Sequence, residues 1–192
     1  AIPWAINLAR EHDIIHTTTY NAALPAWLAA KITGKKVILH VLEVFGRQWF
    51  ALGEKNLFLS LGFYFYEKLL FILPFNYYIA ISQYTKNNLK NFFSIDSKKI
   101  SVVYPQIDKA LWDPQKYNRE EFRKKLGLKN EFVYLYFGRP GISKGVEYLL
   151  KAVPLIKKKI PQSNLVLILT KDPKNRYEMI KKNIASLDIK KD

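Results

Sequence analysis

The sequence predicts an α/β protein with two halves, each built on a parallel sheet. Short apolar, β-branched runs alternate with longer helical segments, which is typical of right-handed βαβ units. Runs such as VILHV and YYIAI are almost wholly apolar, as expected of strands that are covered on both faces. A polar stretch after Pro105 interrupts the alternation once. We therefore divide the chain into domains at residues 1–110 and 111–192.

In the first half, predicted strands alternate with predicted helices, and three of the helices have a recognisable start or end. Strands are predicted at residues 13–18, 35–45, 77–82 and 99–105. Helices are predicted at 4–11, 22–32, about 54–71, and 83–93. Asn21 and Ser82 are expected to cap helices, and Pro25 fits a first helical turn, where a missing N–H costs little. Gly34 and Pro74 are expected to end helices.

The second half restarts the same pattern. Strands are predicted at 131–138 and 164–170, and helices at about 118–126, 145–160 and 175–187. The helix at 145–160 places its apolar residues on one face: Val146, Leu149, Leu150, Val153 and Ile156. Pro154 lies inside this helix and is expected to kink it or split it.

The composition excludes several classes of site. The chain has no cysteine, which excludes a disulfide scaffold, a thiolate zinc site and a cysteine nucleophile. The imidazoles are those of His12, His16 and His40, so we expect no metal site. The most apolar stretch, 56–81, is interrupted by charged residues and a proline, so no membrane span is predicted. The first residues lack the features of a signal peptide, and we expect a cytoplasmic location.

The charge is strongly basic. The net charge is +15, and residues 96–192 carry 22 basic and 11 acidic side chains. This excess fits phosphorylated ligands, an anionic membrane surface or nucleic acid, and it equally fits a lysine-rich solvated surface. No nucleic-acid-binding motif accompanies it, so we do not expect a nucleic acid partner.

The most informative local pattern is YFGRPGISKGVEYLLKA, at 136–152. A strand ends at Gly138, a loop carries Arg139, Gly141 and Lys144, and a helix opens near Gly145. Free N–H groups at a helix start, together with a guanidinium and an ammonium group, suit a diphosphate. The spacing matches neither a dinucleotide fingerprint nor a P-loop. A plain strand-to-helix turn is the alternative.

Four segments in order resemble retaining glycosyltransferases of family four, which have the GT-B fold. They are DIIHTTTYNAALPAWLAAK, YYIAISQYTKNNLKNFF, ISVVYPQIDKALWDP and FGRPGISKGVEYLLKA. The resemblance implies two Rossmann-like domains: residues 1–110 on the acceptor side and 111–192 on the donor side. It implies that the protein transfers a sugar from a nucleotide-diphosphate donor to a hydroxyl acceptor with retention of configuration, without a metal or other cofactor.

The resemblance also implies roles for individual residues. Gly138, Arg139, Gly141 and Lys144 are expected to bind the donor diphosphate. Where the family often has His-Glu this chain has Leu42 and Glu43, so Glu43 and the nearby His40 are the candidate catalytic residues. Three residues are expected on the acceptor side of the cleft: His16, Gly46 and Ser82. The alternatives are structural: a loop-ordering carboxylate for Glu43, a strand histidine for His40, a strand end for His16 and a helix cap for Ser82.

The expected partners are a nucleotide sugar and a carbohydrate or lipid-linked acceptor. The basic charge and the aromatic segment LFLSLGFYFYEKLLFILPF add a peripheral position on an anionic membrane as a further expectation. Two family motifs, a Gly-rich amino-terminal loop and a pair of glutamates, are missing, so we interpret the sequence as an internal piece that is inactive by itself. The rival interpretation is a non-catalytic basic module that binds phosphate groups, anionic lipid or nucleic acid.

Overall fold

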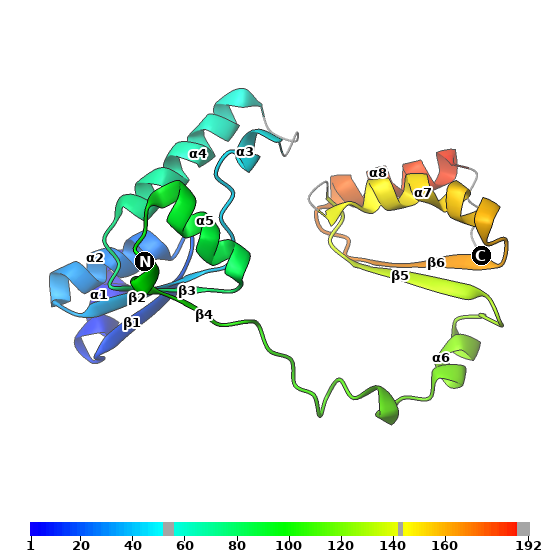
Figure 1. Ribbon diagram of the computed structural model, residues 1–192, viewed down its shortest axis with the longest axis horizontal. Coiled ribbons are helices and arrows are strands. Elements are labelled where there is room, and N and C mark those ends of the chain that lie inside the picture. Colours follow the sequence, from blue (N-terminus) through cyan, green and yellow to red (C-terminus); the bar gives the residue numbers. More distant parts are fainter. Residues whose placement is uncertain (52–55, 142–143, 188–192) are drawn as a thin grey trace. The chain divides into compact units, whose positions relative to one another are not determined.

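The computed structural model describes residues 1–51, 56–141 and 144–187 (Figure 1). Contacts divide the chain into two compact units, Ala1–Asp108 and Lys109–Asp192. Each unit contains a parallel sheet with helices packed on it, so the predicted α/β class is confirmed. The assignment of the two units to the acceptor and donor sides stays a prediction.

The first unit is a four-stranded parallel sheet with the order β1-β2-β3-β4. Its strands are β1 (Ile14–Thr18), β2 (Lys36–Val41), β3 (Tyr77–Ala80) and β4 (Ile100–Val102). Its helices are α1 (Ile2–Arg10), α2 (Ala23–Thr33), α3 (Gln48–Ala51), α4 (Leu57–Ile72) and α5 (Gln83–Phe93). A 3₁₀ turn at Ser97–Lys99 precedes β4.

One face of this sheet forms the core. Val37, Leu39 and Val41 point to the same side of β2 and pack with buried residues of α2, α4 and α5, such as Leu70 and Leu89. The alternate side chains lie on the other face, because side chains alternate along a strand. That second face is more exposed and carries the residues Ile14, His16, Ile38, His40, Tyr77 and Ile79.

Four of the five predicted helix signals are confirmed and one is wrong. Pro25 lies in the first turn of α2, and Pro74 follows the end of α4. Gly34 ends α2 with a φ of 70°, a left-handed conformation that glycine adopts without strain. Ser82 caps α5, with its hydroxyl oxygen accepting the Thr85 N–H at 3.1 Å. Asn21 does not cap α2: the cap position is Ala22, and no side chain bonds there. The Ala23 N–H donates instead to the Tyr20 carbonyl at 3.2 Å, so the backbone satisfies this donor.

The predicted strand at 35–45 is shorter than expected. β2 ends at Val41, and the chain then forms a loop that leads into the short helix α3, which the sequence pattern did not predict. Among the described residues, no helix is both long and apolar enough to cross a bilayer.

The second unit pairs β5 (Phe132–Gly138) with β6 (Ser163–Leu169) in parallel, with α7 (Val146–Lys159) and α8 (Lys174–Ser186) packed on one face. A 3₁₀ turn at Pro114–Lys116 and α6 (Arg119–Lys125) precede the sheet. Pro154 does not split α7, which runs unbroken past it. Pro154 is exposed and has no N–H to donate to the Leu150 carbonyl. Leu150 and Val153 are both buried, so packing of the inward helix face stabilises the turn that lacks this hydrogen bond.

Candidate functional site

The predicted diphosphate loop lies between β5 and α7. β5 ends at Gly138 and α7 begins at Val146, so the loop is at the carboxyl end of its strand, where ligands bind in parallel α/β sheets. Gly138 has a φ of 151° and Gly145 a φ of 71°, both of which favour glycine. Residues 142–143 of this loop lie outside the described residues.

The loop presents two exposed cations. Within the described part of the chain, neither Arg139 nor Lys144 makes an ion pair with a carboxylate. The Tyr136 hydroxyl donates to the Arg139 carbonyl at 3.1 Å and so fixes the backbone that carries the guanidinium. The α7 start has no side-chain cap. A helix N-terminus is favourable for negative charge, so loop and helix together favour an anion.

Sequence reasoning missed Glu147, which lies in the first turn of α7. Both of its carboxylate oxygens are buried, and neither has a hydrogen-bond partner in the described chain. A carboxylate in this turn interacts favourably with the helix dipole. Burial raises the pKa of the Tyr136 hydroxyl, and the charge of Glu147 adds to this rise. Glu147 therefore adds negative charge at the start of α7, next in the chain to the loop that carries Arg139 and Lys144.

In the first unit, a buried glutamate of α4 organises the loops at the carboxyl ends of β1 and β2. Glu67 is fully buried, and its two oxygens accept four hydrogen bonds. Oε1 accepts from the Tyr20 hydroxyl at 3.0 Å and the Phe45 N–H at 2.9 Å. Oε2 accepts from the Gly46 N–H at 2.7 Å and the Trp49 indole N–H at 3.2 Å. The sequence pattern indicated Glu67 only as an interruption of an apolar segment.

The predicted residues Glu43 and Gly46 lie in this same loop but in different surroundings. The Glu43 carboxylate is exposed and bonds to no described residue, so the ordering carboxylate of the loop is Glu67 rather than Glu43. Gly46 is buried with a φ of 51°, and a Cβ atom there would lie 3.2 Å from the Phe92 ring. Gly46 thus meets both a conformational and a steric requirement of the loop.

His16 and His40 are brought together on the exposed face of the sheet. Their rings stack with centroids 5.6 Å apart, and they project from the neighbouring strands β1 and β2. The His40 Nε2 is buried and has no hydrogen-bond partner among the described residues. Burial lowers the pKa of His40, and the adjacent His16 lowers it further. The neutral imidazole is therefore favoured at pH 7.

This shift predicts a pH dependence of stability. The folded pKa of His40 lies below its ordinary value of 6.5, so the unfolded chain takes up a proton first as pH falls. The free energy of unfolding should therefore decrease as the pH is lowered from 7.5 through 6.5 to 5.5 in urea titrations. His40→Gln should flatten this dependence, whereas His12→Gln, at an exposed site, should not. Equal slopes in all three proteins would contradict the assignment.

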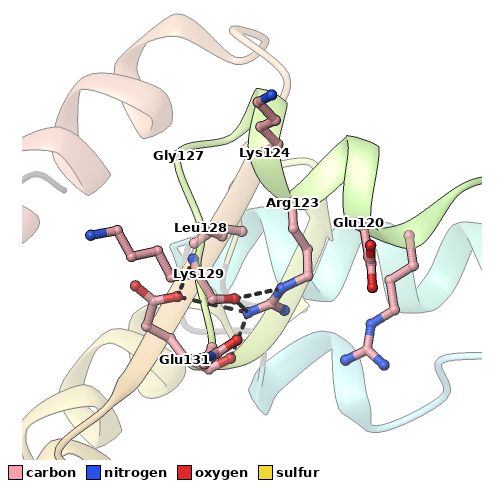
Figure 2. A pocket seen from close by; sticks show the side chains of 9 residues that line it. Glu120, Arg123, Lys124, Gly127, Leu128, Lys129 and Glu131 are labelled. Carbon is pink, nitrogen blue, oxygen red and sulfur yellow. Dashed lines mark hydrogen bonds and ion pairs between the residues drawn. The ribbon is translucent and has the colours of Figure 1, made fainter.

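Neither of two cavities in the structure contains the predicted diphosphate loop. A cavity of about 650 Å³ lies between α6 and the start of β5 (Figure 2). There Arg123 donates to the carbonyls of Lys129 and Glu131, so its guanidinium orders the turn that enters β5. This is the amino end of the strand. A second cavity of about 400 Å³, between α1, α2 and β1, includes His16 in its lining.

The family model described as Glycosyltransferase Family 4 matches residues 1–111, which contain β1 to β4 and the loops that Glu67 holds, but not the β5–α7 loop. The chain belongs to glycosyltransferase family 4. Among curated proteins, this family-4 chain is similar to spore coat protein SA of Bacillus subtilis, with 31% identity over 95 residues that cover 47% of the chain and 25% of the relative.

Solved structures agree on the fold. Alr3699/HepE of Anabaena, in complex with UDP and glucose, has 20% identity and a TM-score of 0.77, covering 98% of this chain and 48% of that one. A glycosyltransferase from Rickettsia africae has 20% identity and a TM-score of 0.67, with 97% and 48% covered. The family-4 chain thus spans about half the length of these structures, and their likeness confirms the predicted fold class.

Proposed function

We propose that the whole protein transfers a sugar from a nucleotide-diphosphate donor to a hydroxyl acceptor, with retention of configuration and without a metal. The family match over residues 1–111 carries this proposal. The bond between the anomeric carbon and the diphosphate oxygen breaks, a bond to the acceptor oxygen forms, and the acceptor proton is released. HepE structures with UDP and with UDP-glucose support a nucleotide sugar as the donor class.

The β5–α7 loop supports a donor site in the second unit. Negative charge grows on the departing diphosphate. Arg139 and Lys144, which are exposed and form no ion pair with any described residue, would offset it most strongly in the transition state. These two cations, with the start of α7, take the part that a metal ion plays in other transferases. Gly138 and Gly141 add no side chain to the loop that would hinder a phosphate.

The first unit supplies the candidate groups for the acceptor side. Glu43 offers an exposed carboxylate at the carboxyl end of β2, and the neutral His40 imidazole can accept or donate a hydrogen bond. His16 lies beside His40, and Ser82 lies where β3 passes into α5. We propose that these residues face the acceptor, with Gly46 shaping the loop that carries Glu43.

Product analysis tests this function. The whole protein is incubated with UDP-, GDP- and ADP-sugars and a panel of hydroxyl acceptors, with and without EDTA, and the anomer formed is assigned by NMR. We expect nucleoside diphosphate release, a product with the anomeric configuration of the donor, and the same rate with EDTA. An inverted product would contradict retention, and loss of the rate with EDTA would contradict metal independence.

We also propose that transfer takes place at an anionic membrane surface and that the acceptor is lipid-linked. The exposed stripe of α4 favours this: Phe58, Phe65, Leu69 and Ile72 recur at helical spacing on one face. Phe58 is 83% exposed and Ile72 is 73% exposed. Lys68 is exposed in the same helix, while Glu67 is buried, so the outward side of α4 presents a cation and no anion. Aromatic insertion beside basic residues suits an anionic bilayer.

Vesicle binding tests the α4 stripe. We expect the chain to bind vesicles with anionic lipid more tightly than neutral ones, and added salt to weaken that binding. Phe58→Ser with Ile72→Ser should reduce partitioning at least about tenfold, because each such side chain contributes roughly 1.5–3 kcal/mol when it leaves water. Leu155→Ser, at an exposed position of α7, is the matched control. Equal and negligible binding to both vesicle types would contradict the membrane proposal.

A further inference from the structure

Glu67 connects two loops that are separate in sequence. The Tyr20 hydroxyl comes from the loop after β1, while the N–H groups of Phe45, Gly46 and Trp49 come from the segment after β2. Both loops leave the carboxyl ends of adjacent parallel strands, the edge at which ligands bind in such sheets. A single side chain of α4 therefore holds both loops at this edge.

A second side chain of α4, that of Tyr66, holds the backbone of Tyr20. The Tyr66 hydroxyl donates to the Tyr20 carbonyl at 3.0 Å, whereas Glu67 accepts from the Tyr20 hydroxyl. Tyr20 has a φ of 68°, a left-handed conformation that costs energy for a residue with a side chain and persists only where the surroundings enforce it. Its ring also meets Trp49 edge to face, with centroids 6.3 Å apart. The strained backbone is thus fixed at both the carbonyl and the side chain.

The contact set requires a carboxylate. Each oxygen of Glu67 accepts two hydrogen bonds, and all four partners are donors. A glutamine would keep one accepting oxygen, but its NH₂ group would face two of these partners, at least one of which is an N–H group that can only donate. In a fully buried site, donors left without an acceptor cost their desolvation free energy.

We propose that Glu67 is a positioning residue for sugar transfer: it holds the loop that presents Glu43 in register with the loop after β1. This inference rests on the proposed function, because it assigns these loops to the reacting groups. Glu67 touches neither substrate nor acceptor in this account. Glu67 acts through the loop backbone. Replacing it should therefore reduce the order of the loop, measured as faster hydrogen exchange, and through that loss of order it should lower turnover.

Hydrogen exchange tests the loop order without any substrate. In Glu67→Gln, we expect the amide of either Phe45 or Gly46, whichever faces the new NH₂ group, to exchange about tenfold faster or more, because its hydrogen bond to a charged acceptor is lost. The amides of Leu39 and Val41 inside β2 should change less than about twofold. Leu89→Ala is the control, since it removes a fully buried side chain from α5 of the same unit and leaves all four Glu67 hydrogen-bond partners in place. It should not raise loop exchange selectively.

Turnover is then measured in the whole protein carrying the same substitutions, at a temperature where circular dichroism shows both variants folded. Nucleoside diphosphate release from the donor found active with wild type is the readout. We expect Glu67→Gln to lower kcat at least about tenfold relative to Leu89→Ala. Glu67→Asp keeps the charge but is one methylene shorter, and it should fall between wild type and Glu67→Gln in both measurements. If Glu67→Gln does not fold, the comparison of Glu67→Asp with wild type tests the inference.

The outcomes separate the inference from the proposed function. Fast loop exchange with lost turnover supports the inference. Unchanged loop exchange overturns it, and so does fast exchange with turnover equal to that of Leu89→Ala; the proposed function survives both results. A wild-type protein that turns over no nucleotide sugar overturns the proposed function and, with it, the positioning role, whatever the exchange shows.

Discussion

Arg139→Ala in the whole protein is expected to lower kcat/KM for the nucleotide-sugar donor roughly 10²–10³-fold, the usual loss when one group that stabilises developing charge is removed. The guanidinium is exposed and forms no ion pair with any described residue, so folding does not depend on it. The free energy of unfolding should change by no more than about 0.5 kcal/mol. Steady-state kinetics and urea unfolding measure the two effects.

Lys158→Ala is the matched control for Arg139→Ala. It removes the same charge from the last turn of α7, whereas Arg139 lies before the first turn. We expect Lys158→Ala to keep wild-type kinetics. Lys144→Ala should resemble Arg139→Ala, although a single ammonium group binds phosphate with less geometric specificity than a guanidinium. If Arg139→Ala and Lys158→Ala have the same kinetics, the diphosphate assignment of the loop is wrong.

Glu67→Ala is expected to lower the free energy of unfolding by about 4 kcal/mol or more, a large part of the roughly 5–15 kcal/mol that stabilises a typical domain. The change leaves four donors without their acceptor and opens a cavity under the β2 loop. Urea unfolding of the chain, monitored by circular dichroism, provides the value.

Glu43→Ala is the control within the same loop region. Its carboxylate is exposed and has no partner among the described residues, so we expect the free energy of unfolding to stay within about 0.5 kcal/mol of wild type. In the whole protein, Glu43→Ala should nevertheless lower sugar transfer. A Glu67→Ala protein as stable as Glu43→Ala would show that the four hydrogen bonds do not hold the loop.

Helix and strand positions could be predicted wherever local chemistry decides them. Ser82 caps α5 because its hydroxyl reaches the first free N–H groups, and Gly34 ends α2 because the left-handed turn favours glycine. The end of β2 could not be predicted. Residues 42–45 are mostly apolar and continue the strand pattern, but the Phe45 N–H bonds to Glu67 from another element. A tertiary contact overrides the local pattern at that point.

The candidate site could be predicted in part. The β5–α7 loop follows from sequence alone because its glycines, cations and strand–helix order are contiguous. Glu67 is distant in sequence from the loops it holds, so no local motif contains it. The one local signal of Glu67 is that it is a lone carboxylate in an apolar helix. Such a group is rarely buried unless it is paired, so its position indicates a partner elsewhere in the fold. The His16–His40 pair required knowledge of strand pairing.

Calorimetric titration of the whole protein with nucleoside diphosphates tests the central claim most directly, namely that the Gly138–Gly145 loop of this family-4 protein binds the donor diphosphate. UDP, GDP and ADP are compared with their monophosphates, in wild type and in the double variant Arg139→Ala with Lys144→Ala. We predict that wild type binds at least one diphosphate at least tenfold more tightly than its monophosphate. The double variant should lose that preference. Binding of the same diphosphate with equal affinity by wild type and the double variant would contradict the claim.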